Sequence, residues 1–234
     1  MSLFRFKEFS VRQEKTPMKV GTDGVLLGAW ARVEETTHRI LDIGTGTGVI
    51  ALMMAQRAPW AEVVGVDIDP VDEARENGAC SPWSHRVQFY QAAVQQFDAA
   101  PFDLILSNPP FFTESLTCPD RGRTLARHAV ALPFEELRDA VVRLLKAEGR
   151  FALVLPVVEA ERFIRLCEGL LRPIRRTAVR TTPRHPAKRL LVEMVHAASP
   201  QRAEECDELM IGTGEHETYT EAYRALTRDF YLKF

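Results

Sequence analysis

The sequence predicts an α/β fold in which a mostly parallel sheet is covered by helices on both faces. Strand-like and helix-like segments alternate from residue 39 onward, which is the pattern of successive β-α-β units. Several strand segments are continuously apolar, such as RILDI and GRFALVLP, as expected for strands that are buried on both faces. No Ser/Gly linker divides the 234 residues, so a single domain over 1–234 is expected.

The first predicted elements precede this alternation. FRFKEFSVRQ at 4–13 has apolar residues at imperfectly alternating positions, which predicts a strand or a hairpin. VGTDGVLLGAWA at 20–31 predicts a loop that enters a helix, with Thr22 or Asp23 as its N-cap.

The remaining elements follow from apolar spacing and from proline and glycine positions. Short apolar runs predict strands at 39–43, 61–68, 86–92, 102–107, 149–156, 174–181 and 189–196. Helical spacing predicts helices at 47–58, 70–79, 134–149 and 157–171. The second of these helices opens with Pro70, where a missing N–H donor costs little, and the third closes with Gly149.

Composition indicates an ordinary globular protein, with 46% hydrophobic and 26% charged residues. The sequence has no apolar run of membrane-spanning length and no signal-peptide pattern, so we expect a cytoplasmic location and no membrane contact. Cysteines and histidines are scattered without ligand spacing, so reduced thiols and no metal site are expected; the cysteines are Cys80, Cys118, Cys167 and Cys206.

The formal net charge of −2 conceals a segregation of charge along the chain. Residues 172–189 hold seven Arg or Lys and no acid, RGRTLARH at 121–128 is also basic, and the last 34 residues are acid-rich, as in EECDE at 204–208. Basic patches beside a nearly neutral total favour a focused site for a polyanion. The alternative is a solvated charged face.

The first strand of the alternation ends in LDIGTGTG. The alternate glycines Gly44, Gly46 and Gly48 allow a tight turn and the close approach of a ligand, and the following helix presents free N–H groups. The next strand ends in VDID, with Asp67 placed 19 residues beyond Gly48, a spacing that suits a carboxylate bound to ribose hydroxyls. Asp42 would disfavour a phosphate and suits an ammonium group. A nucleoside-containing cofactor is therefore predicted.

The strand at 102–107 runs into SNPPFF, an asparagine, two prolines and two aromatic residues. Together with the glycine loop and the acidic second strand end, this segment resembles Rossmann-like S-adenosylmethionine methyltransferases of the amino-methylating subgroup. The resemblance implies a class I methyltransferase fold with a seven-stranded sheet. One departure is that Ala92 and Ala93 follow the third strand, where such enzymes often place an acid for the cofactor adenine; backbone groups or Gln95 are expected to replace it.

The chemistry of such a site requires acceptors for an amine whose lone pair is delocalised into an aromatic ring. The side-chain oxygen of Asn108 and the carbonyl of Pro109 would each accept one N–H, which orients the amine and favours positive charge on its nitrogen. Pro109 and Pro110 keep that carbonyl rigid, and Phe111 would stack on a base drawn out of its nucleic acid. The alternative is a simple turn with Phe111 and Phe112 in the core.

A narrower resemblance rests on 6–31, on 219–234, on SPWSHRV at 81–87 and on the pattern from Arg123 to His128. These stretches resemble the bacterial tRNA1(Val) (adenine(37)-N6)-methyltransferase family. The resemblance implies N6-methylation of the adenine on the 3′ side of the anticodon of a valine tRNA, with S-adenosylmethionine as cofactor. Residues 1–32 would pack over the cofactor site, where Thr22 and Asp23 could contact the methionyl end or the base. Candidate RNA contacts are Lys19, Arg121, Arg123, Arg127, Arg175, Arg176, Arg180, Arg184, Lys188 and Arg189.

Several alternatives remain open at this point. The same tetrapeptide NPPF serves enzymes that methylate a glutamine side-chain amide in release factors or N2 of guanine. A nucleotide-binding oxidoreductase is disfavoured because the glycines do not follow G-x-G-x-x-G, and a non-catalytic RNA-binding module is disfavoured because Asp42, Asp67 and Asn108 are all present. The basic blocks and the absence of an evident protein-docking domain favour RNA.

Overall fold

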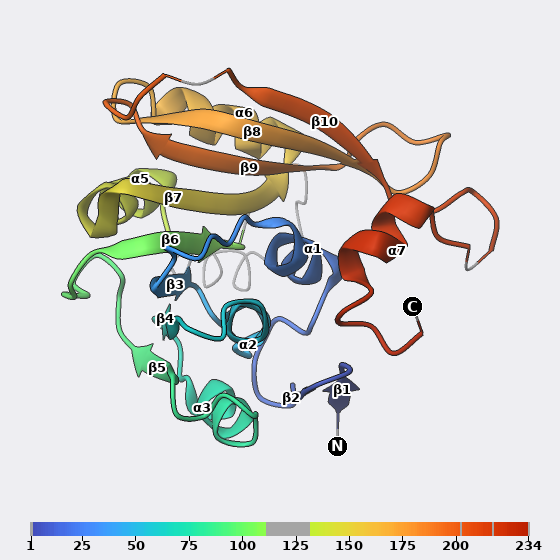
Figure 1. Ribbon diagram of the computed structural model, residues 1–234, viewed down its shortest axis with the longest axis horizontal. Coiled ribbons are helices and arrows are strands. Elements are labelled where there is room, and N and C mark those ends of the chain that lie inside the picture. Colours follow the sequence, from blue (N-terminus) through green and yellow to red (C-terminus); the bar gives the residue numbers. More distant parts are fainter. Residues whose placement is uncertain (1, 111–131, 202, 217, 234) are drawn as a thin grey trace, which may run out of the picture.

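The computed structural model describes residues 2–110, 132–201, 203–216 and 218–233 (Figure 1). The N-terminal segment forms the predicted hairpin, in which β1 (Leu3–Arg5) and β2 (Ser10–Arg12) pair antiparallel. Helix α1 (Thr22–Trp30) follows, with Gly21 as its N-cap and no side-chain cap. The predicted cap at Thr22 or Asp23 is thus wrong by one or two positions, because both residues already belong to the first helical turn.

The alternating region follows the predicted order closely. Its first half comprises β3 (Arg39–Ile43), α2 (Val49–Arg57), β4 (Glu62–Asp67), α3 (Asp72–Ala79), β5 (Val87–Gln91) and β6 (Phe102–Ser107). After the undescribed residues come α5 (Phe134–Leu144), β7 (Leu145–Pro156), α6 (Val157–Leu166), β8 (Leu171–Arg180), β9 (Arg189–His196), β10 (Glu205–Met210) and α7 (Glu221–Thr227).

The main sheet has the strand order β10-β8-β9-β7-β6-β3-β4-β5. Strands β7, β6, β3, β4 and β5 run parallel to one another, and β9 is antiparallel to both β7 and β8. The chain moves outward from β3 to β5 and then crosses to the other side of β3 with β6. This reversal makes the carboxyl end of β3 a topological switch point, where open α/β sheets bind their ligands.

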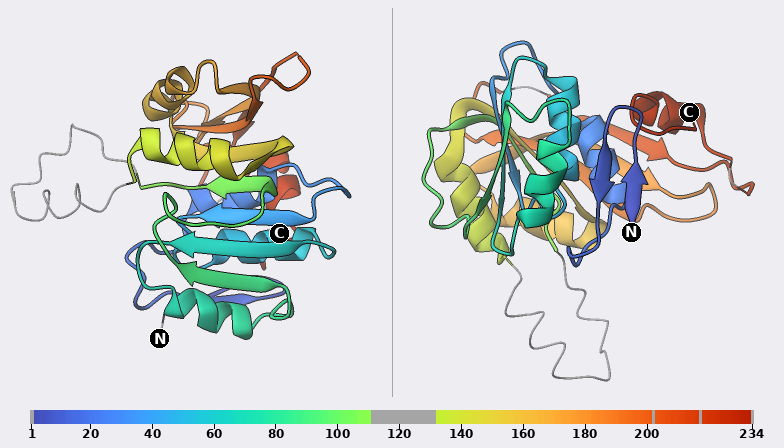
Figure 2. Two further views of the ribbon diagram at one scale, coloured as in Figure 1. Left: turned by 90° about the vertical axis from the view of Figure 1, so that its left-hand side faces the viewer. Right: turned by 90° about the horizontal axis from the view of Figure 1, so that it is seen from below.

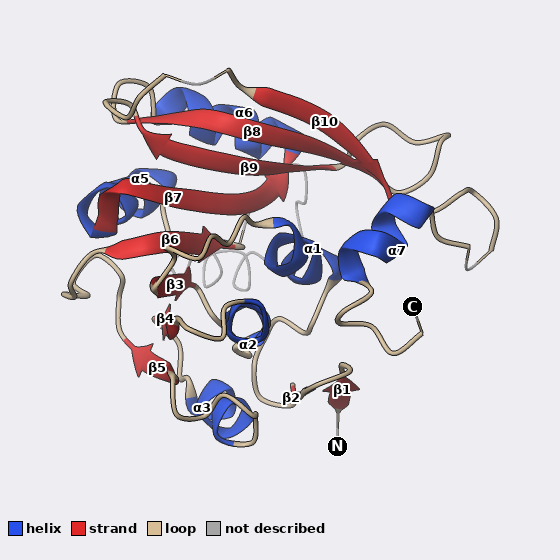
Figure 3. Cartoon of the chain, viewed as in Figure 1, coloured by secondary structure: helices blue, strands red, loops and turns tan. Residues whose placement is uncertain are grey.

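Helices cover both faces of the sheet, as Figures 2 and 3 show. Alternate residues of each central strand enter two separate cores: Ile40 and Leu104 pack beneath α1 and α2, whereas Leu41 and Ile105 pack beneath α5 and α6. This division confirms the α/β fold, with helices on both faces of a mostly parallel sheet, that the sequence predicts.

The sheet has eight strands in place of the expected seven, because β10 adds to β8 in parallel. The sequence gives little sign of β10: four of its six residues are exposed and only Leu209 is buried, so the usual apolar alternation is missing. The boundary of α5 also differs from the prediction. Leu145 packs in the core and pairs with Phe102, and the register shift after this pair accommodates Gly149, which therefore belongs to β7 and does not close the helix.

The two ends of the chain lie side by side (Figure 1). The ring of Tyr231 lies 6.4 Å from that of Phe4 and 6.1 Å from that of Phe6, measured between centroids. The backbone N–H of Lys7 donates to the Phe230 carbonyl at 2.9 Å. The two terminal stretches that carried the narrower resemblance therefore form one structural unit.

Candidate active site

Three sequence motifs meet at the carboxyl edge of the sheet. Strand β3 lies between β4 and β6, so the glycine loop after β3, Asp67 at the end of β4 and Asn108 after β6 are neighbours. The Ser107 hydroxyl donates to the Ile43 carbonyl at 2.9 Å and is fully buried, which fixes the end of β6 against the end of β3. The predicted cofactor and catalytic motifs are thus brought to a single place.

The glycine loop needs glycine for its backbone conformation. Gly44, Gly46 and Gly48 have φ of 72°, 52° and 82°, which side-chain-bearing residues rarely adopt. A Cβ on Gly44 would meet no atom within 4 Å, so this part of the loop faces open space. At position 48 packing also requires glycine, because an added Cβ would lie 2.8 Å from the Phe89 ring.

Asp42 lies beneath this loop with no exposed surface. One carboxylate oxygen accepts hydrogen bonds from the Thr45 hydroxyl at 2.6 Å and from the Ala51 N–H at 3.2 Å. The other oxygen, Oδ1, is buried and has no partner among the described residues. Burial raises the pKa of Asp42 to about 7. An ammonium group is the partner that would satisfy the free oxygen and favour the ionised form.

Asp67 is half-buried and supports the loop from β4. Its carboxylate accepts hydrogen bonds from the N–H of Gly46 at 2.8 Å and of Asp69 at 3.0 Å. Burial raises its pKa above the ordinary range, although these hydrogen bonds oppose the shift. The carboxylate keeps further acceptor capacity for ribose hydroxyls.

Asn108 leaves β6 with a half-buried side chain, followed by buried Pro109 and exposed Pro110. A Cβ on Gly24 would lie 3.8 Å from the Asn108 amide nitrogen, so the start of α1 lies beside the catalytic candidate. Phe111, Phe112 and the basic segment that follows lie outside the described residues, so their predicted roles stay predictions.

The start of α1 is also tied to the far side of the site. The Arg189 Nε donates to Asp23 Oδ2 at 2.7 Å, and Arg189 pairs with Pro156 at the end of β7. Asp23 is therefore engaged in an ion pair, whereas Thr22 is exposed. Lys19 turns its ammonium toward the carbonyls of its own loop, which favours a structural role over the predicted RNA contact.

The sequence predicts that the residues after β5 contact the cofactor adenine through backbone groups or through Gln95. Ala92 and Ala93 are half-buried after β5, and the Gln95 amide donates to the Glu136 carboxylate on α5. Because Gln95 already has this partner, backbone groups are the better candidates for cofactor adenine recognition.

Two of the predicted RNA-binding arginines serve the fold. The Arg175 guanidinium lies 4.2 Å from the Trp30 ring centroid and 3.9 Å from the Asp207 carboxylate. Arg176 forms an ion pair with Glu204, whose segment precedes β10. The acid-rich tail thus supplies both arginines with partners inside the chain, and their predicted phosphate contacts stay a prediction.

The basic loop 181–188, which joins β8 to β9, lies at the same sheet edge as Asn108. Arg180 at its start donates to the His185 carbonyl at 2.9 Å and reaches Glu208 at 3.3 Å. Arg184 and Lys188 are exposed, and neither side chain has a hydrogen-bond or ion-pair partner in the described part of the chain. They are the members of the predicted set that remain available to an external polyanion; Arg121, Arg123 and Arg127 are not described.

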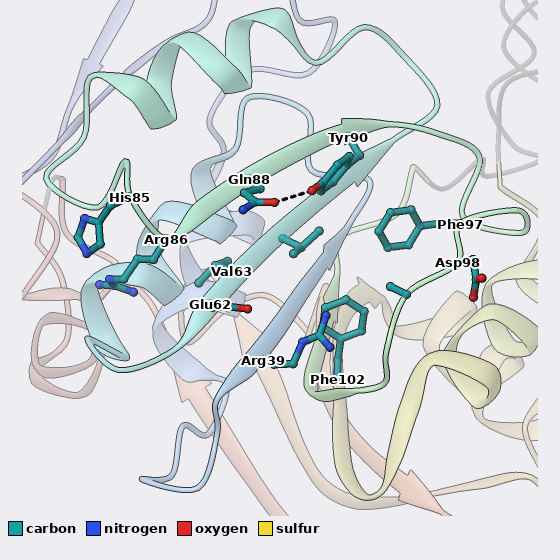
Figure 4. A pocket seen from close by; sticks show the side chains of 12 residues that line it. Arg39, Glu62, Val63, His85, Arg86, Gln88, Tyr90, Phe97, Asp98 and Phe102 are labelled. Carbon is teal, nitrogen blue, oxygen red and sulfur yellow. Dashed lines mark hydrogen bonds between the residues drawn. The ribbon is translucent and has the colours of Figure 1, made fainter.

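A cavity of about 270 Å³ lies elsewhere, near the amino ends of the strands (Figure 4). Its lining includes Arg39, Glu62, Tyr90, Phe97 and Phe102, and the Arg39 guanidinium lies 5.0 Å from the Phe102 ring centroid. None of the predicted site residues lines this cavity, so we assign the candidate site to the carboxyl edge.

Sequence reasoning missed two polar residues of α3, Glu73 and Asn77, which bind the backbone of the segment before α1. The sequence predicts only a covering helix over 70–79 at this place. Their four-residue spacing places them on one helix face, but only the fold shows what that face meets.

Within the described ranges, no group of three His, Cys, Asp or Glu residues could hold a metal ion. In the same ranges no helix is long and apolar enough to cross a membrane.

Comparisons with known proteins agree with this geometry. The family model of the methyltransferase small domain matches residues 23–155. A predicted O-methyltransferase from Agrobacterium tumefaciens has a similar fold, with a TM-score of 0.67 and 20% identity over 89% of this chain and 96% of that one. A TehB-like SAM-dependent methyltransferase from Corynebacterium glutamicum gives a TM-score of 0.51 and 19% identity over 75% of this chain and 89% of that one. At these identities the likeness concerns the fold alone.

Curated relatives are similar over nearly the whole chain. The tRNA1(Val) (adenine(37)-N6)-methyltransferase of Flavobacterium psychrophilum is 45% identical, covering 99% of this chain and all of the relative. The enzyme of the same name from Aeromonas hydrophila is 41% identical, covering 98% of this chain and 97% of the relative. S-adenosylmethionine is the cofactor of this fold, and the unpartnered Asp42 oxygen and the open glycine loop fit it. The chain belongs to the tRNA1(Val) (adenine(37)-N6)-methyltransferase family.

Proposed function

We propose that this chain transfers a methyl group from S-adenosylmethionine to N6 of an adenine in tRNA, adenine 37 of a valine tRNA, in the cytoplasm. The observation that carries the proposal is the position of Asn108 and Pro109 beside the glycine loop at the switch point of the sheet. The names of the curated relatives support the choice of tRNA and of position.

The chain's own residues have distinct roles in this proposal. Asp42 and the glycine loop hold the methionyl end of the cofactor, and Asp67 holds its ribose. When bound, S-adenosylmethionine supplies an electrophilic methyl group on a sulfonium. The Asn108 side-chain oxygen and the Pro109 carbonyl accept the two N–H groups of the adenine amine, which stabilises positive charge as it develops on nitrogen. No strong general base is needed, because the nitrogen becomes acidic once it is methylated.

The substrate reaches this site along the basic loop 181–188. Arg184 and Lys188 contact phosphates, which orients the RNA without reading its sequence. Because N6 of a stacked base is hard to reach, the adenine leaves its stack to enter the pocket.

The experiment uses purified protein, methyl-labelled S-adenosylmethionine and bulk tRNA from a strain that lacks the enzyme. Label recovered as N6-methyladenosine supports the proposal. Label recovered only in a glutamine of an added release factor would replace it with protein methylation, and label in another nucleoside would leave RNA methylation with a different target.

A further inference from the structure

Residues 13–20, here called the strap, form a closed loop between β2 and α1. The Val20 N–H donates to the Gln13 side-chain oxygen at 2.7 Å, which closes the base of the loop. The Lys19 ammonium donates to the carbonyl of Gln13 and lies 3.3 Å from that of Glu14 and 3.4 Å from that of Thr16. The carbonyl groups of this turn thus surround a single cation.

The N–H groups of the same turn converge on Glu73 of α3. Its carboxylate accepts from the N–H of Glu14 at 2.6 Å, of Lys15 at 3.1 Å and of Thr16 at 2.9 Å, and also from the Thr16 hydroxyl. Glu73 is only 5% exposed. Burial would raise its pKa, but the hydrogen bonds from Thr16, Lys15 and Glu14 outweigh burial and lower the pKa to about 2. The carboxylate is therefore ionised at neutral pH.

One turn further along α3, Asn77 joins the end of β2, directly before the strap, to the glycine loop. Its amide oxygen accepts from the Arg12 N–H at 2.8 Å, and its amide nitrogen donates to the carbonyls of Arg12 at 3.0 Å and Thr47 at 2.9 Å. A Cβ on Gly46 would lie 3.5 Å from the Thr16 methyl group. The strap therefore lies over the loop that faces the cofactor.

We propose that Glu73 is a positioning residue that fixes the strap over the glycine loop, and that the strap so held retains the cofactor in its site. The inference rests on S-adenosylmethionine binding at that loop. A turn held by an anion on its N–H side and a cation on its carbonyl side keeps one conformation, so the cofactor does not have to order it on binding. Replacing one carboxylate oxygen with an amide nitrogen removes the charge and one of the two acceptors, which between them take the N–H groups of Glu14, Lys15 and Thr16, and this opens the strap.

The test compares Glu73→Gln with Glu76→Gln. Glu76 lies on the same helix and reaches Arg12 at 3.4 Å and Lys15 at 3.9 Å, but these ion pairs are exposed and contribute little. Glu73→Gln should accelerate amide hydrogen exchange of residues 14–16 in cofactor-free protein. It should also weaken S-adenosylhomocysteine binding, measured by calorimetry, by about tenfold, the loss of roughly one charged hydrogen bond. The KM for S-adenosylmethionine should rise by a similar factor with kcat nearly unchanged, and Glu76→Gln should match the wild type.

Unchanged exchange or unchanged affinity in folded Glu73→Gln would overturn the proposal, because a purely structural residue would lower stability without either effect. If Glu73→Gln does not fold, Thr16→Val decides by the same two measurements, since it removes one donor to Glu73 and keeps the side-chain shape. If the wild-type protein binds no S-adenosylhomocysteine, the cofactor assignment itself is wrong. This result is distinguishable from failure of the strap proposal, in which the wild type binds the cofactor product and Glu73→Gln binds it equally well.

Discussion

Asp42 combines complete burial with a carboxylate oxygen that has no partner among the described residues. Its pKa is raised from 3.8 to about 7 by burial, so the folded protein holds this proton more tightly than the unfolded chain does. The stabilisation from this group is fully present below the unfolded pKa and is lost as the pH rises through the folded pKa. As the pH rises through about 7, Asp42 becomes ionised, and its carboxylate can then bind an ammonium group.

Replacing Asp42 with Asn tests both consequences. As the pH rises from about 5 to about 8, the free energy of unfolding of the variant should increase relative to that of the wild type. Only the wild type loses the stabilisation from protonated Asp42 in this range. Affinity for S-adenosylhomocysteine at about pH 8 should fall by roughly tenfold to a hundredfold, the value of a hydrogen bond to a charged group. Urea unfolding and calorimetry at the two pH values measure these effects; pH-independent differences would contradict this role.

Asn108 is expected to act on the reaction and not on the cofactor. Asn108→Ala removes an acceptor aimed at the developing charge, so kcat should fall by about a hundredfold to a thousandfold. S-adenosylhomocysteine should bind within about threefold of the wild-type affinity, since a neutral contact of this kind contributes little to binding. Single-turnover labelling of tRNA and calorimetry separate the two quantities. Near-normal turnover would exclude the proposed role.

The packing of α3 against β5 depends on glycine. A Cβ on Gly78 would lie 2.8 Å from the Phe89 ring, which is too close for a normal contact. The same ring would lie 2.8 Å from a Cβ on Gly48. Alanine at position 78 would gain about 1 kcal/mol in helix propensity but would overpack this contact by about 1–3 kcal/mol. Gly78→Ala should therefore lower the free energy of unfolding by about 1 kcal/mol in urea titrations. Adding Phe89→Leu should reduce that loss, whereas a stabilised single variant would show that the ring moves aside.

Helices and strands could be predicted from the sequence where a local residue pattern determines them. The apolar runs at Arg39–Ile43 and Phe102–Ser107 form strands with those bounds, and the glycine loop and Asp67 lie where their motifs indicate. Strand β10 could not be predicted, because its stability comes from backbone pairing with β8 and from acid pairs with arginines remote in the chain. The role of Glu73 could not be predicted for the same reason, because its hydrogen-bond partners lie 57 to 59 residues away in the sequence.

Across the whole molecule, one edge of the sheet carries the site and the basic loop 181–188. Arg184→Ser with Lys188→Ser should weaken tRNA binding and lower the slope of log affinity against log salt by roughly one to two, because each phosphate contact releases about one counterion. Arg165→Ser is the control, an exposed arginine near the end of α6 at the other edge, and it removes one charge where the double variant removes two. Filter binding over a range of salt concentrations makes the comparison. Half the loss of the double variant with Arg165→Ser would indicate a general charge effect.

The activity proposed for the whole molecule is methylation of N6 of adenine 37 in a valine tRNA. The most direct measurement incubates the purified protein and S-adenosylmethionine with two transcripts of that tRNA, one natural and one with guanine at position 37, and maps the product by nuclease digestion and mass spectrometry. We predict a single N6-methyladenosine at position 37 of the natural transcript and no methylation of the altered one. Methylation at another nucleotide, or equal methylation of both transcripts, would contradict the account.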